Sequence, residues 1–387
     1  MTWCALLMVT MNVQAQQALD EQAVTLEAPT SVPEFDKNEL SEEELNRKLF
    51  DAIAGGDLVT AKLLLNAMTY YAQNQEGETA LTLAIKTENV DMVALLVQNA
   101  VINLKNADGE TPLTLAIRQK NAEIMDLVAK RAKAALKNDA GVAPLFLALE
   151  HGAELPFLQR LVNKGADVNR PSNGITPLYL AAQQENVKGV AFLLRNGAKV
   201  SNPNENGESP MYIAVANGYD LVTGILAHKS EAPAADVNWQ NELGEPLLNI
   251  AAEMGHTEIV RILLEKGADP NVRDYMDNTA LILAADRGDE PMVKMLLAKG
   301  ADVNHQNIMG YTAITLAAKN QHGVIANMLA ENGANPEIRS FQGFYAAQFG
   351  DYANAYDQYN QQLDAELQAA GVESSYEQLS SEEELNY

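Results

Sequence analysis

Apolar residues recur along this chain in short helical stretches separated by glycine-centred turns. In the copy that begins at Gly174, apolar positions between 178 and 194 follow the spacing of two amphipathic helices. Thr176 stands where its hydroxyl can cap the first helix, and Pro177 takes the first helical position, where no amide hydrogen is needed. Gly197 can adopt the left-handed conformation that ends the second helix. Each copy is therefore predicted to be a helix-turn-helix unit.

The same unit recurs through most of the chain. The equivalent turn residues are Gly77, Gly109, Gly141, Gly174, Gly207, Gly244, Asp277, Gly310 and Gly343. The steps between them are 32, 32, 33, 33, 37, 33, 33 and 33 residues. A fixed period near 33 is the signature of a stacked array in which each unit contacts only its neighbours. We therefore predict an all-α solenoid over residues 41–370, with about nine to ten units including the terminal capping helices.

The motifs of these units resemble those of ankyrin repeat proteins. Thr-Pro-Leu stands at 111–113 and 176–178, Gly-His-Thr-Glu-Ile-Val at 255–260, and Gly-Ala-Asp at 165–167, 267–269 and 300–302. The resemblance covers roughly 300 residues in register. It implies a continuous concave binding surface made of the turn tips and the exposed face of each first helix.

One departure from the family concerns the histidine that usually follows Thr-Pro-Leu. Its position holds Thr82, Thr114, Phe146, Tyr179, Tyr212, Asn249, Ile282 or Thr315. The hydrogen bonds of that histidine cannot be assumed here, so we expect an array looser than a consensus one.

Three stretches break the regular pattern. The unit at Gly141 has Ala143 where a capping threonine is expected. The unit at Gly207 is four residues longer, with its excess in residues 228–235. Such insertions form loops on one face, often the binding face, although a neutral loop is the alternative. Residues 130–137 form the chain's only basic cluster, predicted to be an extended solvated second helix or, alternatively, a patch for an anionic partner.

The N-terminal stretch differs from the array. Residues 1–15 carry no charge and combine an apolar run from Trp3 to Val9 with a Val-x-Ala pattern that ends at Ala15. This resembles the second half of a secretory signal peptide and is too short to span a bilayer. The basic start of such a signal is missing, so we expect the true start to lie upstream of Met1. A cytoplasmic N-terminus is the alternative interpretation.

Residues 16–40 are acidic, contain prolines and are predicted to be a flexible linker. Order is expected to begin at the capping box of residues 41–44, followed by helices at 45–54 and 58–66. At the other end, residues 344–370 are predicted to close the array with a tyrosine-rich second helix. Residues 371–387 are predicted to form an acidic disordered tail.

Charge and composition narrow the possible partners. The formal charge is −25, from 52 acidic and 27 basic residues, so the basic footprint of a nucleic-acid-binding protein is missing. The acidity favours solubility, or alternatively attraction to a basic partner. The single cysteine, Cys4, excludes an internal disulfide or cysteine metal site.

No catalytic, cofactor or metal site is predicted. The five histidines are scattered without ligand spacing, and the resemblance implies a structural role for His151 and His256. The chain has no P-loop, dinucleotide fingerprint, Gly-x-Ser-x-Gly elbow or His-Glu-x-x-His motif.

The turn tips provide the candidate binding residues. The position two residues before each unit start is mostly small or polar, but in the last three units it holds Tyr275, Ile308 and Phe341. Residues one period apart should stack into a ridge, and contiguous exposed apolar groups favour an interaction surface. The apolar ridge, as used below, comprises Leu243, Tyr275, Met276, Ile308, Met309 and Phe341. The alternative is that these side chains fold back onto the neighbouring turn or the C-terminal segment.

These observations favour a non-catalytic, monomeric scaffold that presents its concave face and turn tips to a protein partner, without membrane insertion. Export and the absence of any Asn-x-Ser/Thr sequon favour the bacterial periplasm, with the cytoplasm as alternative. Two other functions stay open: a secreted effector or toxin-neutralising protein that acts on another cell, and an enzyme with a pocket between the closing unit and the array.

Overall fold

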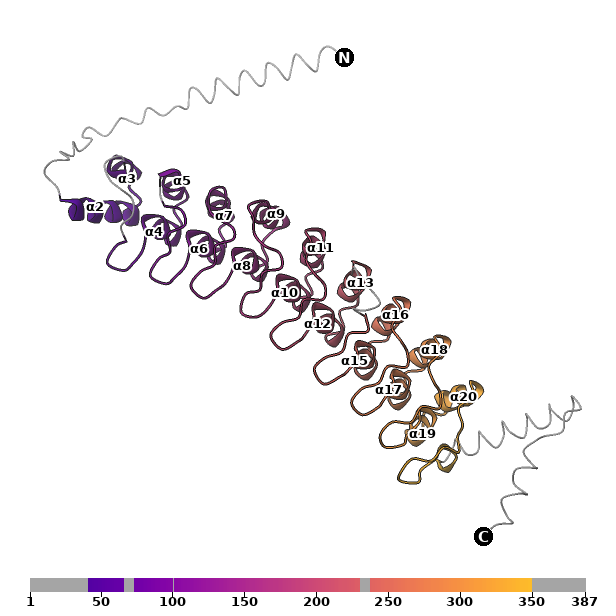
Figure 1. The fold of residues 1–387 in the computed structure, drawn as a ribbon. Coiled ribbons are helices and arrows are strands. Elements are labelled where there is room, and N and C mark those ends of the chain that lie inside the picture. Colours follow the sequence, from indigo (N-terminus) through magenta and orange to yellow (C-terminus); the bar gives the residue numbers. More distant parts are fainter. Residues whose placement is uncertain (1–40, 66–72, 100, 230–236, 350–387) are drawn as a thin grey trace, which may run out of the picture.

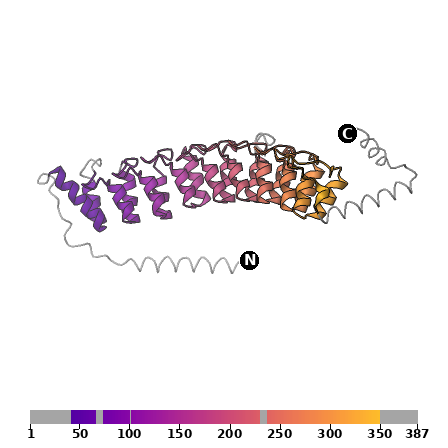
Figure 2. The ribbon, with the colours of Figure 1, turned by 90° about the horizontal axis from the view of Figure 1, so that it is seen from below.

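A computed structural model describes residues 41–65, 73–99, 101–229 and 237–349 (Figure 1). The helices stand in two parallel rows, and long turns project from the row of first helices. Seen from below, the helix pairs lie side by side along one gently curved array (Figure 2). The predicted all-α solenoid is confirmed for these residues.

Each unit supplies one helix to each row. The first helices are α2 (Glu42–Gly55), α4 (Ala80–Lys86), α6 (Pro112–Gln119), α8 (Pro144–Glu150), α10 (Pro177–Gln183), α12 (Pro210–Ala216), α15 (Leu247–Met254), α17 (Ala280–Arg287) and α19 (Ala313–Lys319). The second helices are α3 (Leu58–Leu65), α5 (Val90–Asn99), α7 (Ala122–Ala129), α9 (Leu155–Asn163), α11 (Val187–Arg195), α13 (Asp220–Lys229), α16 (Thr257–Glu265), α18 (Glu290–Ala298) and α20 (Gly323–Glu331). A single 3-10 turn, η1 (Ala346–Gln348), follows.

The helices begin where the capping residues predict. Thr111 accepts a 3.1 Å hydrogen bond from the amide of Thr114, and Thr176 does the same for Tyr179. Ala143 makes no capping bond, because its methyl side chain has no hydrogen-bond acceptor. Ser41 and Glu44 form the predicted capping box at the start of α2.

The core runs without interruption along the array because each unit is packed on the next. Fully buried alanines such as Ala181 and Ala284 let neighbouring first helices approach closely. Asparagines in the turns then join the units. Asn271 accepts a 2.7 Å bond from the amide of Asp302 and donates a 3.2 Å bond to the carbonyl of Gly300, and Asn304 repeats this pattern one unit later.

The position of the missing family histidine is filled in several ways. Thr82, Thr114 and Thr315 each bond the capping threonine of their own helix. Asn249 instead donates a 2.7 Å bond to the carbonyl of Asn278 in the next unit. The side chain at this position is therefore hydrogen-bonded in several units, and in one unit it bonds the next unit. The expected looseness of the array stays a prediction.

The expected extended helix over residues 130–137 is wrong. Helix α7 ends at Ala129, and the following residues form turns. The guanidinium of Arg131 donates to the carbonyls of Val97 and Gln98, and the amide of Lys133 donates a 2.9 Å bond to Asn103. These bonds direct the chain back to the preceding unit.

Several predicted segments lie outside the described residues. They are the signal peptide at 1–15, the linker at 16–40, most of the insertion at 228–235, the closing helix after 349 and the tail at 371–387. Within the described ranges no helix is long and apolar enough to cross a membrane.

Candidate functional site

The turn tips that carry the apolar ridge are built by short side chains at their base. Asp274 accepts bonds from the amides of Met276 and Asn278, each 2.8 Å long. Asn307 likewise accepts from Met309 and Tyr311, at 3.0 and 2.9 Å. A side chain that bonds its own backbone two and four residues on holds the turn in one conformation. The tips are therefore fixed before any partner arrives.

Backbone hydrogen bonds hold successive tips against one another. The amide of Ile308 donates to the carbonyl of Met276 over 3.0 Å, and the amide of Phe341 donates to the carbonyl of Met309 over 3.1 Å. The structure thus brings the tips of the last three units together in the stacking that the sequence predicts.

The ridge side chains lie largely in solvent. Tyr275 is 64% exposed, Ile308 48% and Phe341 79%, while Leu243 and Met309 are also exposed and Met276 is half-buried. Sequence reasoning missed Phe344, which is 39% exposed and follows the same last turn. Its ring lies 6.1 Å from that of Phe349. The apolar surface therefore extends beyond the predicted ridge toward η1.

A second feature combines residues of helices α10 and α12 with residues of the turns that precede α12 and α15. The hydroxyl of Tyr179 donates a 2.7 Å hydrogen bond to the carboxylate of Glu208. Burial and then this bond raise the pKa of Tyr179 well above its ordinary value. The rings of Tyr212 and Trp239 meet at 5.4 Å, tilted by 50°. Sequence reasoning did not identify this group, which is called the acidic aromatic cluster below: Tyr179, Glu208, Tyr212, Trp239 and Glu245.

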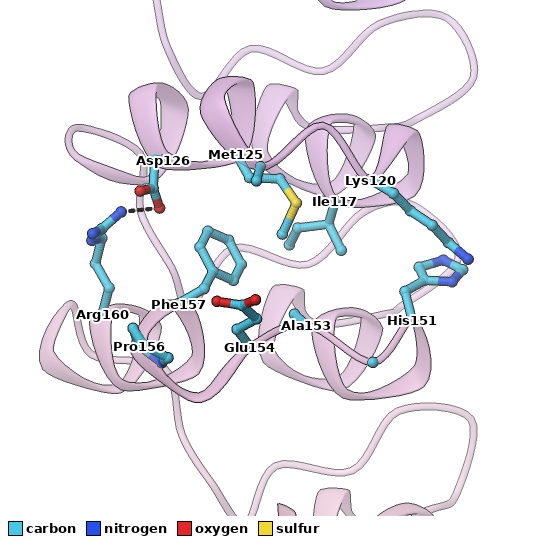
Figure 3. A pocket seen from close by; sticks show the side chains of 12 residues that line it. Ile117, Lys120, Met125, Asp126, His151, Ala153, Glu154, Pro156, Phe157 and Arg160 are labelled. Atoms are coloured by element: carbon cyan, nitrogen blue, oxygen red, sulfur yellow. Dashed lines mark hydrogen bonds and ion pairs between the residues drawn. The ribbon is translucent and has the colours of Figure 1, made fainter.

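A pocket of about 280 Å³ lies between the units at Gly109 and Gly141 (Figure 3). Met125, Ile117 and Phe157 form its apolar wall, and the carboxylate of Glu154 points into it. The ion pair between Arg160 and Asp126 closes one end. This location differs from the junction of array and closing unit, where the enzyme alternative places its site.

A longer turn between the two helices of its unit forms part of the pocket wall. Residues 151–154 join α8 to α9, whereas residues 184–186 suffice between α10 and α11. Glu154 makes no capping bond at the start of α9, whereas Asn186 caps α11 through the amide of Gly189.

The polar side chains of the pocket lining are all titratable. They belong to Lys120, Asp126, His151, Glu154 and Arg160. His151 and Lys120 lie beside each other at the end opposite the ion pair of Arg160 and Asp126 (Figure 3). Burial, and then the charge of Lys120, lower the pKa of His151. The Nε2 atom of His151 is buried and has no hydrogen-bond partner among the described residues.

The basic cluster at 130–137 is also engaged within the chain. The ammonium of Lys137 donates a 2.8 Å bond to the carbonyl of Pro171, and Arg131 is bonded to carbonyls as described above. In the part of the chain that the structure describes, no group of three or more His, Cys, Asp or Glu residues could hold a metal ion.

Comparison with known proteins agrees with the repeat pattern. One stretch of the chain is similar to a putative ankyrin repeat protein of Acanthamoeba polyphaga mimivirus (33% identical over 129 residues, 32% of this chain and 31% of that protein). A stretch is also similar to human ankyrin repeat and SAM domain-containing protein 1A (40% identical over 111 residues, 28% of this chain and 10% of that protein). A third relative is the human transient receptor potential cation channel subfamily A member 1 (33% over 98 residues, 25% and 8%).

The matched parts span about a third or less of these curated relatives, so their whole activities do not transfer. The family described as ankyrin repeats (3 copies) matches residues 49–138, 127–204, 200–274 and 273–340. These matches cover most of the array of helix pairs, and the chain belongs to the ankyrin repeat family.

Proposed function

We propose that this chain is a non-catalytic scaffold that binds a protein partner through the apolar ridge. Ankyrin repeats generally mediate protein–protein interaction, which supports the class of function. The observation that supports the site is the exposure of large apolar side chains on three consecutive tips that are joined by backbone hydrogen bonds. Exposed apolar groups on a preformed surface give binding energy at a low entropic cost.

We further propose that the chain acts as a monomer after export to the bacterial periplasm. Export rests on the composition of residues 1–15, and the bacterial location also on the absence of any Asn-x-Ser/Thr sequon. Mass spectrometry of the protein isolated from its native source tests it: the proposal expects cleavage after Ala15. A secreted effector is the second candidate, and finding the protein in the medium instead of the periplasm would favour it.

The ridge is tested by affinity capture from the native envelope fraction. The bait is the full chain, and the test variant carries Tyr275→Ser, Ile308→Ser and Phe341→Ser. A matched control carries three equally exposed apolar changes on second helices: Val59→Ser, Leu221→Ser and Val324→Ser. Both variants are first shown by circular dichroism to keep the parent's helix content.

The proposal expects one protein to be retained by the parent and the control and lost by the ridge variant. A partner that the ridge variant retains as well as the parent does would contradict the assignment of the site. Loss of that partner by both variants would mean that general surface apolarity, and not the ridge, controls capture.

A further inference from the structure

Two positions recur in each unit, one in the turn before the first helix and one near the end of that helix, and in two units they form an ion pair. The first position follows the unit start, and the second lies eight residues later. Glu78 pairs with Lys86 in the unit at Gly77, and Glu110 pairs with Arg118 over 2.9 Å in the next unit. In the unit at Gly310 the ammonium of Lys319 lies 4.8 Å from the ring centre of Tyr311. A Lys or Arg at the second position therefore contacts the side chain at the first position in each of these three units.

The units at Gly207 and Gly244 keep the carboxylate but lack the cation. Glu208 and Glu245 occupy the first position, while Ala216 and Glu253 occupy the second. Neither Glu208 nor Glu245 has an ion-pair partner among the described residues, and the undescribed ones include only one basic residue, Lys37. Glu208 and Glu245 are therefore partly buried carboxylates without the ion-pair partner that Glu78 and Glu110 have.

These carboxylates already have neutral hydrogen-bond donors. Glu208 accepts 2.7 Å bonds from the hydroxyl of Tyr179 and the amide of Asn204, and Glu245 accepts a 2.5 Å bond from Asn241. These donors position the two carboxylates but leave their charge uncompensated. Each oxygen can accept more than one hydrogen bond, so both groups can still bind a charged donor.

An aromatic surface adjoins the two carboxylates. Tyr212 and Trp239 are both half-buried, and their rings contact each other at 5.4 Å. The pKa of Tyr212 is raised by burial and then by the charges of Glu208 and Glu245, which means that both carboxylates act on its hydroxyl. Carboxylates beside an aromatic face favour a planar guanidinium, which can form two parallel hydrogen bonds and stack on a ring.

We propose that the partner of this scaffold inserts an arginine side chain at Glu208 and Glu245, beside Tyr212 and Trp239. The partner thus supplies the cation that Lys86 and Arg118 supply within the chain. This deepens the proposed function and rests on it. Leu243, the first member of the apolar ridge, belongs to the same turn as Glu245, so one partner can contact both surfaces.

The test follows the fluorescence of Trp239. The chain has two tryptophans, so Trp3→Phe in the full chain leaves Trp239 as the only one. This protein is titrated at about 0.15 M salt, where distant charges are screened, with hexa-arginine, hexa-lysine and the neutral analogue hexa-citrulline. The proposal expects saturable binding of hexa-arginine, weaker binding of hexa-lysine and none of hexa-citrulline. Equal affinity for the lysine and arginine peptides would overturn the guanidinium assignment.

Paired variants separate the site from the general negative charge of the chain. Glu208→Gln with Glu245→Gln should weaken hexa-arginine binding by at least about tenfold, since it removes both charge partners. Glu43→Gln with Glu331→Gln changes the net charge equally at remote exposed positions and should alter binding by less than about twofold. An equal loss in both double variants would overturn the proposal.

A third variant leaves both carboxylates in place. Ala216→Arg puts a guanidinium at the position that Arg118 holds in its own unit, so it should occupy Glu208 and weaken hexa-arginine binding several-fold. Leu221→Arg adds the same charge on the exposed face of α13 as a control. Unchanged binding by Ala216→Arg would contradict the site. Because these titrations need no native partner, they can fail while the capture experiment on the ridge succeeds, and the reverse.

Discussion

The amide of Phe341 donates a 3.1 Å hydrogen bond to the carbonyl oxygen of Met309 in the preceding unit. This contact is possible because Gly310, next to Met309, has no side chain. A Cβ atom on Gly310 would lie 2.8 Å from the nitrogen of Phe341 and 3.0 Å from the Cα of Ser340. The glycine therefore allows the last two tips of the ridge to approach closely.

Gly310→Ala should destabilise the C-terminal end of the array. Gly310 has φ +76°, so a left-handed alanine costs about 1–2 kcal/mol, and the backbone contact adds to this. Gly244→Ala is the control, since Gly244 has φ +79° but a Cβ atom added there would meet no other atom within 4 Å. Urea unfolding followed by circular dichroism should give Gly310→Ala the lower midpoint. Equal midpoints would mean that the close approach of the tips contributes nothing.

Restoring the cap that one unit lacks should stabilise the array. Thr111 caps α6, whereas Ala143, with extended backbone at the equivalent position, makes no capping bond for α8. Ala143→Thr is expected to raise the free energy of unfolding by about 1 kcal/mol, and Thr111→Ala to lower it by a similar amount. Thermal and urea unfolding of both variants test this. A fall in stability for Ala143→Thr would show that the buried site has no room for the added atoms.

The repeat period and the turn chemistry made much of this fold predictable. Glycine starts such as Gly77 and Gly174 adopt positive φ, and Asp277, the one start without glycine, does so too, at 58°. The stacking of the ridge tips also follows from the period, because equivalent residues of adjacent units must be neighbours. At the turn starts and the ridge tips, the local sequence and the stacking of the units therefore predict the same structure.

The errors arose where contacts between units override local preference. Residues 130–137 are rich in Lys and Ala, which favour helix, yet α7 ends before them and Arg131 is bonded to the preceding unit. The pocket beside Phe157 lies where one turn is a residue longer, and the repeat period does not reveal such a cavity. The acidic aromatic cluster did have a sequence signal, the loss of the cation eight residues after Glu208 and Glu245.

The bond between Tyr179 and Glu208 should make stability depend on alkaline pH. The pKa of Tyr179 is raised in the folded chain, so its contribution is complete below about pH 10, the ordinary tyrosine pKa, and declines as the pH rises further. The decline approaches about 1.4 kcal/mol per pH unit for one group. Tyr179→Phe removes the hydroxyl, and Phe146 already occupies the equivalent position of the preceding unit.

Urea unfolding of the parent and Tyr179→Phe between pH 8 and pH 11 measures this difference. The variant should be less stable by about 2 kcal/mol at pH 8, because a bond to a carboxylate is lost, and the gap should narrow above pH 10. A gap that stays constant with pH would show that Tyr179 ionises as readily in the folded chain as in the unfolded one.

His151 should make the array sensitive to acid. Burial lowers its pKa in the folded chain, so the neutral ring is favoured and its contribution to stability is complete above about pH 6.5, the ordinary histidine pKa. As the pH falls below that value, the unfolded chain takes up a proton first and stability declines toward the folded pKa. His151→Gln removes this titration and places at the end of α8 the residue that Gln184 provides at the end of α10. The variant should therefore lose less stability than the parent between pH 7 and pH 5 in urea unfolding. Parallel losses in the two proteins would mean that His151 accepts its proton without cost, and that water reaches its Nε2 atom.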